Sequence, residues 1–352
     1  MSNKTRILYT IPNFKTAGSQ YVVRSLLERL DKTQYEVFIG VERFPETIPQ
    51  LVPKENRITF LRTGNWWNDV KSFSKKLKKH HITIVHSWDY KSESIEAMGC
   101  KLAQVPYLFT KKNDAWSKRW FLKSVLAKHI AYDNPEMKDR FFSNRLLQNK
   151  ITFIPHGVDT TLFKPSLEKG DNTETFTLCS VGNINENKNQ LFILEALKAL
   201  PEYVHFNMFG KADEPYLEKL KKQIHKEGLE NRVHIKGFVL NEELPHILQE
   251  QDVFVLASKR EGLPVSILEA LACGIPALSS DSGGGARFIF KDTAKENIFS
   301  VNDHKDFIKK LMPFIKDTAY YKRKQRESVQ IAQQFDVKKE VNAYSKLYKE
   351  II

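Results

Sequence analysis

Two glutamates, Glu261 and Glu269, stand out in the segment SKREGLPVSILEALACGIPALSS, with seven residues between them. The run VFVLAS (253–258) just before is typical of a buried strand, so we expect residues 259–263 to form a strand-to-helix loop. Pro264 should open the helix, because a missing N–H is tolerated at the first helical position. Glu261 would then lie in the loop and Glu269 about five residues inside the helix, ~7.5 Å along its axis.

This arrangement suits the binding of a hydroxyl-rich, anionic ligand. An ionised carboxylate only accepts hydrogen bonds, so it fits the hydroxyls of ribose or hexose. Free N–H groups at a helix start fit phosphate or sugar oxygens, and here they would come from residues 262–266. The alternative is that both glutamates face solvent at a helix start, where the helix dipole also favours them.

Glycine turns follow several other strand-like runs. Lys188 lies near the start of the helix predicted from about Gln190. A cation is unfavourable at a helix start unless it neutralises a bound anion. Gly18, before a helix in NFKTAGSQ (13–20), could expose N–H groups to an anion. Each of these features is also compatible with an ordinary turn or a surface lysine. The glycines at predicted strand ends in the second half are Gly182, Gly210 and Gly237.

Strand-like runs alternate with helical patterns along the chain, which predicts mostly parallel sheets covered on both faces. The polar stretch KPSLEKGDNTET (164–175) is the best linker. We therefore expect an α/β protein of two Rossmann-like domains, 1–165 and 166–335, followed by a C-terminal helix in 336–352. The strand-like runs are 6–12, 35–41, 58–61, 82–87, 107–110, 129–133, 151–155, 176–182, 204–210, 233–237, 253–258 and 275–280.

Composition narrows the class of protein. The length of 352 residues is natural for two domains. Three scattered cysteines predict neither a disulfide nor a metal site. We see no signal peptide and no membrane-spanning run, and expect a cytoplasmic protein.

The net charge of +13 lies entirely in the first half. Residues 1–165 hold 28 Lys and Arg against 15 Asp and Glu, whereas residues 166–352 hold 27 of each. A basic surface attracts anionic lipid, nucleic acid or an acidic substrate, or simply aids solubility. The helical segment VKSFSKKLKKH (70–80) places Val70, Phe73 and Leu77 on one face, and WSKRWFL (116–122) is aromatic and basic. These two segments predict peripheral attachment of the protein to an anionic membrane. The alternative is that both segments are helices that pack on their own sheet.

The motif EGLPVSILEALACGIPALSSDSGGG resembles the donor-site signature of retaining glycosyltransferases of family 4, which have the GT-B fold. The similarity continues in SVG (180–182), Lys188, Gly210 and VHIKGF (233–238), and the layout of the first half also fits. It implies two Rossmann-like domains facing across a cleft, with the C-terminal helix crossing back to the first.

The resemblance also implies roles for residues. Glu269 would bind the ribose of a nucleotide sugar, and Glu261 would contact the transferred sugar. Lys188 would neutralise the leaving diphosphate, with Gly18 approaching it from the other domain. The base would lie near Gly237 and Phe238, and no metal or other cofactor is expected. The remaining donor-side residues are Gly182, Asn183, Gly210, Gly262, Leu263, Pro264 and Val265.

Some residues depart from the family pattern. Asn183 stands where the family commonly has a basic residue, so one diphosphate contact is either weaker or supplied from elsewhere, with Arg260 and Lys259 as the candidates. Lys111 and Lys112 stand where many members have a histidine. His86 is an acceptor-side candidate, or else a satisfied structural histidine.

The leading hypothesis is a retaining transferase that moves a hexose-type sugar from a UDP-sugar to a glycan or lipid-linked acceptor, in cell-surface polysaccharide or glycolipid synthesis. It would work without nucleic acid, on the inner face of the cytoplasmic membrane. The alternative is a nucleotide-sugar-binding protein without transferase activity. A Rossmann dehydrogenase is disfavoured, because no GxGxxG motif follows the first strand.

Overall fold

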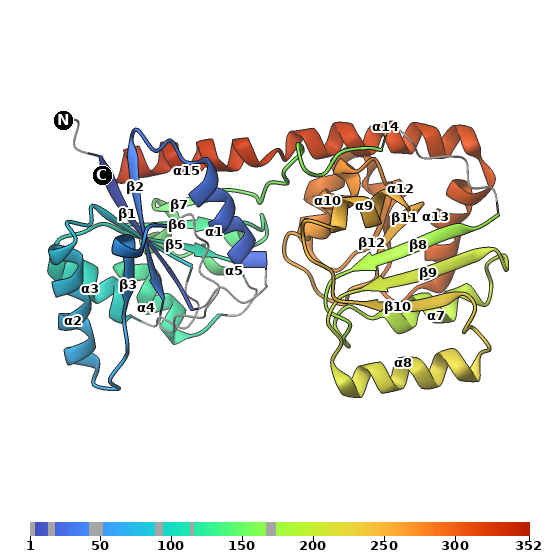
Figure 1. Ribbon diagram of the computed structural model, residues 1–352, viewed down its shortest axis with the longest axis horizontal. Helices are drawn as coiled ribbons and strands as arrows, with labels where there is room; N and C mark the ends of the chain where they lie inside the picture. The colour runs from blue at the N-terminus through green and yellow to red at the C-terminus, as the bar shows by residue number, and fades with distance from the viewer. Residues whose placement is uncertain (1–3, 13–17, 42–51, 89–93, 113–115, 167–173) are drawn as a thin grey trace. The chain divides into compact units, whose positions relative to one another are not determined.

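The computed structural model describes residues 4–12, 18–41, 52–88, 94–112, 116–166 and 174–352. These form two compact units (Figure 1). The first comprises Met1–His156 and Lys338–Ile352, and the second Gly157–Val337. The division falls earlier than residue 165 because Val158 and Phe163 pack in a core of the second unit. Most of the predicted linker, 167–173, lies outside the described residues.

The first unit is built on a parallel sheet in the order β3-β2-β1-β4-β5-β6-β7. Its strands are short apolar runs that are mostly buried, as expected for a sheet covered on both faces. The strands are β1 (Thr5–Ile11), β2 (Tyr35–Val41), β3 (Arg57–Thr59), β4 (Ile84–Ser87), β5 (Tyr107–Lys111), β6 (His129–Tyr132) and β7 (Ile151–Phe153).

Helices cover both faces of this sheet. The core on one face contains side chains of the helix that follows β1 and of the C-terminal helix. The core on the other face contains side chains of the helices that lie between β3 and β7. The covering helices are α1 (Gly18–Arg29) and α15 (Val337–Ile351) on one face, and α2 (Trp66–Lys79), α3 (Ile95–Ala103), α4 (Lys118–Leu126), α5 (Met137–Phe141) and α6 (Arg145–Gln148) on the other. A short 3-10 turn, Lys54–Asn56, precedes β3.

Helix α2 corrects one prediction from the sequence. It begins after Asn65, whose side chain accepts a hydrogen bond from the Asn68 N–H. Its apolar residues Val70, Phe73 and Leu77 are buried in the core beneath it. The apolar stripe therefore packs on its own sheet and is not available for insertion into a membrane.

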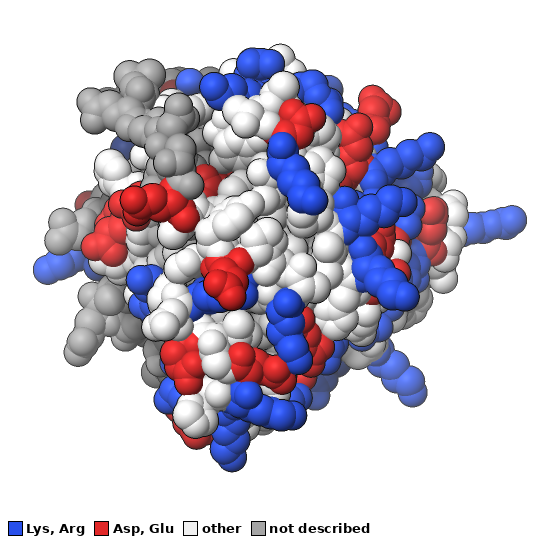
Figure 2. Space-filling view, turned by 90° about the vertical axis from the view of Figure 1, so that its right-hand side faces the viewer, with Lys and Arg blue, Asp and Glu red and all other residues white. Residues whose placement is uncertain are grey.

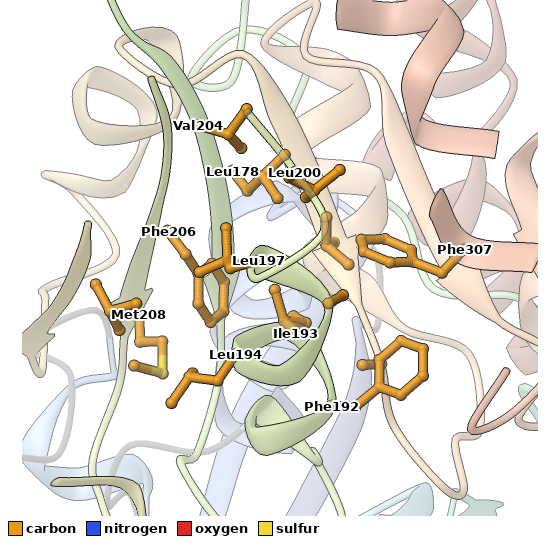
Figure 3. Close-up of a cluster of buried hydrophobic side chains, with 14 of the residues drawn as sticks. Leu178, Phe192, Ile193, Leu194, Leu197, Leu200, Val204, Phe206, Met208 and Phe307 are labelled. Carbon is orange, nitrogen blue, oxygen red and sulfur yellow. The ribbon is translucent and has the colours of Figure 1, made fainter. Parts of the chain in front are cut away.

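The second unit repeats the architecture with a parallel sheet in the order β10-β9-β8-β11-β12-β13. Figure 3 shows helix α7 placing Ile193 and Leu197 against Leu178 and Phe206 of this sheet, while Phe192 lies toward Phe307. The strands are β8 (Phe176–Val181), β9 (Val204–Phe209), β10 (Val233–Gly237), β11 (Val253–Leu256), β12 (Ala277–Ser280) and β13 (Ile298–Phe299). The helices are α7 (Gln190–Leu197), α8 (Glu214–Lys226), α9 (Leu244–Gln249), α10 (Val265–Ala272), α11 (Gly284–Phe290), α12 (Ala294–Asn297), α13 (His304–Lys316) and α14 (Thr318–Gln334), with a 3-10 turn at Lys291–Thr293.

Charges of both signs are interspersed on the side of the molecule that Figure 2 shows, which is the right-hand side of Figure 1. In the described part of the chain, no helix is both long and apolar enough to span a membrane.

Candidate functional site

Three glycines in the second unit meet at the carboxyl ends of neighbouring strands. Gly182, Gly210 and Gly237 follow or end β8, β9 and β10, and all have positive φ. The Gly182 N–H donates to Phe209 O (2.9 Å), and the Gly210 N–H donates to Gly237 O (2.7 Å). A Cβ on Gly210 would overlap the carbonyl of Gly182. Glycine is therefore required where these loops pack, at the edge where parallel sheets bind ligands.

Lys188 and Glu261 form an ion pair beside these glycines. The Lys188 ammonium lies 2.6 Å from Glu261 Oε1. Both side chains are largely buried, with 22% and 14% of their surface exposed. A Cβ on Gly182 would lie 3.4 Å from Lys188 Cε, so the lysine runs alongside Gly182. The structure thus brings together a cation and a carboxylate from positions 73 residues apart, beside the open backbone at Gly182.

The glycine-rich turn at 283–285 packs on the loop that carries Glu261. A Cβ on Gly283 would meet Glu261 O at 2.6 Å, and one on Gly285 would overlap Gly262 O. The Glu261 N–H donates to Ser282 O (2.9 Å). Among the described residues, no hydrogen-bond acceptor is recorded for the N–H groups of Gly262, Leu263 and Val265. These donors are available to an anion or a sugar oxygen.

Glu269 lies in helix α10, which begins at Val265 with Pro264 as its N-cap residue, one position later than predicted. Its carboxyl group has no hydrogen-bond or ion-pair partner in the described structure. The Glu269 side chain is partly buried, and desolvation by the protein around it raises the pKa of its carboxyl group from 4.5 to about 7. An unpaired carboxylate in an apolar setting is unstable on its own, and ligand hydroxyls would stabilise it.

Two exposed basic residues flank the Lys188–Glu261 pair. The Lys259 ammonium lies 3.4 Å from Glu186 Oε2, so part of its charge is already neutralised. The exposed Arg260 side chain has no ion-pair partner among the described residues. Asn183, where the family commonly has a basic residue, is exposed and accepts a hydrogen bond on its carbonyl from Gln190. Arg260 is therefore the better-placed second cation.

Phe238 follows Gly237 and leaves 53% of its surface exposed. An exposed ring beside a left-handed glycine gives a planar ligand a surface to stack on. Within the described residues, no group of three or more His, Cys, Asp or Glu side chains is placed to hold a metal ion.

The acceptor-side candidates lie in the first unit. His86 is fully buried, with Nδ1 2.7 Å from the Tyr348 hydroxyl and Nε2 2.8 Å from Thr110 Oγ1. Lys111 is also fully buried, with its ammonium 4.3 Å from the centre of the Trp120 ring. Both side chains are buried within the first unit. Of these three candidates, Lys112 is the one whose side chain is partly exposed.

Other parts of the predicted site fall at the margin of the description. Gly18 begins helix α1, but residues 13–17 of its loop lie outside the described residues, as do 113–115 after Lys112.

Sequence reasoning missed a buried cluster of Asp133, His156 and Glu340. His156 is 2.8 Å from Asp133 and 3.0 Å from Glu340. The available signal was that Asp133 ends one strand-like run and His156 follows the next. Glu340 is 184 residues from His156 and gave no signal.

Family models match most of the chain. The model described as "Glycosyltransferase Family 4" matches residues 16–162, and that described as "Glycosyl transferases group 1" matches residues 164–333.

Two curated relatives are similar over nearly their whole length. The chain is 27% identical to the UDP-Gal:alpha-D-GlcNAc-diphosphoundecaprenol alpha-1,3-galactosyltransferase of Escherichia coli, over 84% of this chain and 83% of that protein. It is 24% identical to the N,N'-diacetylbacillosaminyl-diphospho-undecaprenol alpha-1,3-N-acetylgalactosaminyltransferase of Campylobacter jejuni, over 94% of each. Among solved structures, HepE of Anabaena in complex with UDP superposes with a TM-score of 0.85 at 18% identity, covering 98% of this chain and 100% of that one.

Proposed function

Because this chain belongs to the group 1 glycosyltransferases and has their two-domain GT-B fold, it is a glycosyltransferase, and we propose that it transfers a hexose-type sugar from a UDP-sugar with retention of configuration. The observation that carries the donor assignment is Glu269. Its carboxyl group is desolvated and unpaired, one helix turn beyond a loop with free N–H groups. Ribose hydroxyls would supply the hydrogen bonds that this carboxylate lacks.

The roles of the other donor-side residues follow from their chemistry. Lys188 and Arg260 would answer the charge of the leaving diphosphate, together with the N–H groups of Gly262 and Leu263. Glu261 would contact the transferred sugar, and Phe238 would lie against the base. This division of charge needs no metal ion. Chelation with EDTA should therefore leave transfer unchanged, and a loss of activity restored by Mg²⁺ would contradict it.

The acceptor that we propose is a sugar linked through diphosphate to a polyprenol. Two relatives of this chain are named for such acceptors. The net positive charge of the first half of the chain suits an anionic diphosphate or an anionic membrane.

Helix α4 is the segment that we propose for a contact with such a membrane. Helix α4 exposes Phe121, Leu122 and Val125, with the exposed Lys118 at its start. Apolar side chains beside cations are the pattern of a peripheral membrane helix. Phe121→Ser with Leu122→Ser should reduce co-sedimentation with anionic liposomes, and equal binding to neutral liposomes would remove the idea.

The donor assignment is tested by screening nucleotide sugars for thermal stabilisation, and then for release of the nucleoside diphosphate. We expect a UDP-sugar to stabilise the wild type and Glu269→Ala to abolish the effect. If only nucleotide sugars with another base stabilise the protein, that base takes the place of uridine in the proposal. Full turnover by Glu269→Ala would overturn the ribose assignment.

A further inference from the structure

The first unit holds a buried set of charges at the carboxyl ends of its strands, distinct from the donor-side residues. Asp133 follows β6, His156 follows β7 and Glu340 lies in helix α15. All three side chains are at least nine-tenths buried. His156 Nε2 donates to Asp133 Oδ2 (2.8 Å), and its Nδ1 lies 3.0 Å from Glu340 Oε1. Burial and Lys112 lower the pKa of His156, but the two carboxylates outweigh them and hold it above its usual value.

One oxygen of this cluster is left over. Asp133 Oδ1 is buried and has no hydrogen-bond partner in the structure. Only 3% of the Asp133 surface is exposed. Removing a carboxylate oxygen from water without a hydrogen bond is unfavourable, so an unpaired one marks a place where another group binds.

Lys112 supplies a charge of opposite sign nearby. Burial lowers its pKa to about 8, while the negative charges of Asp133 and Glu340 oppose this decrease. Its ammonium lies 4.7 Å from the centre of the Trp88 ring. In the described structure Lys112 and Asp133 nevertheless form no ion pair. Trp88 Nε1 is a further buried donor without a partner.

A hydroxyl group of a ligand can satisfy both sides, as a bridging water would. Its hydrogen can be donated to Asp133 Oδ1, while its oxygen accepts from the Lys112 ammonium. The Trp88 Nε1–H adds a donor for a neighbouring oxygen. A sugar presents such hydroxyls in a fixed arrangement.

We propose that Lys112 and Asp133 bind a hydroxyl of the acceptor sugar between them, with Trp88 Nε1 donating to a second oxygen. His156 and Glu340 are positioning residues, because they fix the Asp133 carboxylate. The identity of the ligand as an acceptor sugar rests on the proposed function, whereas the presence of a hydroxyl-binding site rests on the geometry of the first unit.

The test is a binding measurement without turnover. Calorimetry would follow wild-type protein with a panel of octyl-diphospho-sugars bearing glucose, galactose, N-acetylglucosamine or N-acetylgalactosamine, and separately with UDP. Lys112→Met and Asp133→Asn should each weaken binding of the preferred probe by about tenfold or more, the effect of losing a hydrogen bond to a charged group. UDP affinity should change less than about twofold. Lys128→Met, at an exposed lysine of the same unit, is the matched control.

Unchanged probe binding in Lys112→Met, or no binding of any probe to the wild type, overturns the proposal and leaves a bridging water as the occupant. If Asp133→Asn does not fold, Lys112→Met is the deciding variant. We expect Lys112→Met to fold, because it removes a positive charge that burial already destabilises. Failure of the wild type to bind UDP would contradict the proposed donor and leave this inference standing on the sugar titration.

Discussion

Replacing Glu269 with glutamine should stabilise the ligand-free protein and weaken donor binding. The Glu269 pKa is about 7 in the folded chain and 4.5 in the absence of burial. A carboxyl group whose pKa is raised by folding lowers stability as pH rises through that window, and the penalty is complete above it. At 1.36 kcal/mol per pKa unit, ionised Glu269 costs about 3 kcal/mol at pH 8 and only about 1 kcal/mol at pH 5.

Glutamine resembles the protonated carboxyl group and avoids this penalty. Thermal unfolding of Glu269→Gln at pH 8 should therefore show a Tm increase of roughly 6–12 °C, at about 2–4 °C per kcal/mol, and a much smaller increase at pH 5. Glu250→Gln, at an exposed glutamate of the same unit, should change neither value. An unchanged Tm at pH 8 would show that the Glu269 carboxylate is not desolvated.

Donor binding should change in the opposite direction. Loss of a hydrogen bond to a charged group weakens binding by about 10- to 100-fold, which calorimetry with a UDP-sugar would measure. In the wild type, the ionised fraction of Glu269 rises about tenfold from pH 6 to pH 8, so affinity should rise by a similar factor. A stabilised Glu269→Gln variant that still binds the donor normally would refute the ribose contact.

Three further variants test the geometry. Glu261→Gln should bind UDP more tightly while slowing transfer, because the Lys188 ammonium, 2.6 Å from Glu261, is then free for the diphosphate; weaker UDP binding would contradict this. Gly285→Ala should lower stability and abolish donor binding, because a Cβ there overlaps a backbone carbonyl; calorimetry and thermal unfolding would check both, and a normal variant would disprove the close packing. Tyr348→Phe should destabilise the protein by about 1–3 kcal/mol in urea unfolding, since it leaves His86 Nδ1 buried without a partner, and unaltered UDP affinity is expected.

The repeating architecture could be predicted from the sequence because its signal is local. The apolar runs at 35–41 and 233–237 coincide with β2 and β10, and other predicted strands differ by a few residues at their ends. Strand β13 was missed, because Ile298–Phe299 is too short to show a pattern. The amphipathic periodicity of α2 was read correctly as a helix, but periodicity is the same whether the apolar face meets a membrane or a sheet.

The meeting of three candidate donor-side glycines could be predicted for a different reason. Gly182 and Gly210 follow strands and Gly237 ends one, and neighbouring parallel strands bring their carboxyl ends to one edge. The Lys188–Glu261 pair needed the structure, because its partners lie 73 residues apart. The family resemblance implied that the C-terminal helix returns to the first domain, and α15 does belong to the first unit, but the resemblance did not indicate that Glu340 would meet His156, 184 residues away.

The membership of α15 in the first unit has a consequence for how the protein is made. Tyr344 and Tyr348 complete that unit's core and satisfy Thr110 and His86, yet they are synthesised after the whole of the second unit. At ribosomal rates of about 5–20 residues per second, the second unit emerges over roughly 10–35 s while the first remains unfinished. The first unit should therefore be the one exposed to chaperones and proteases during translation, although most of it is synthesised before the second unit.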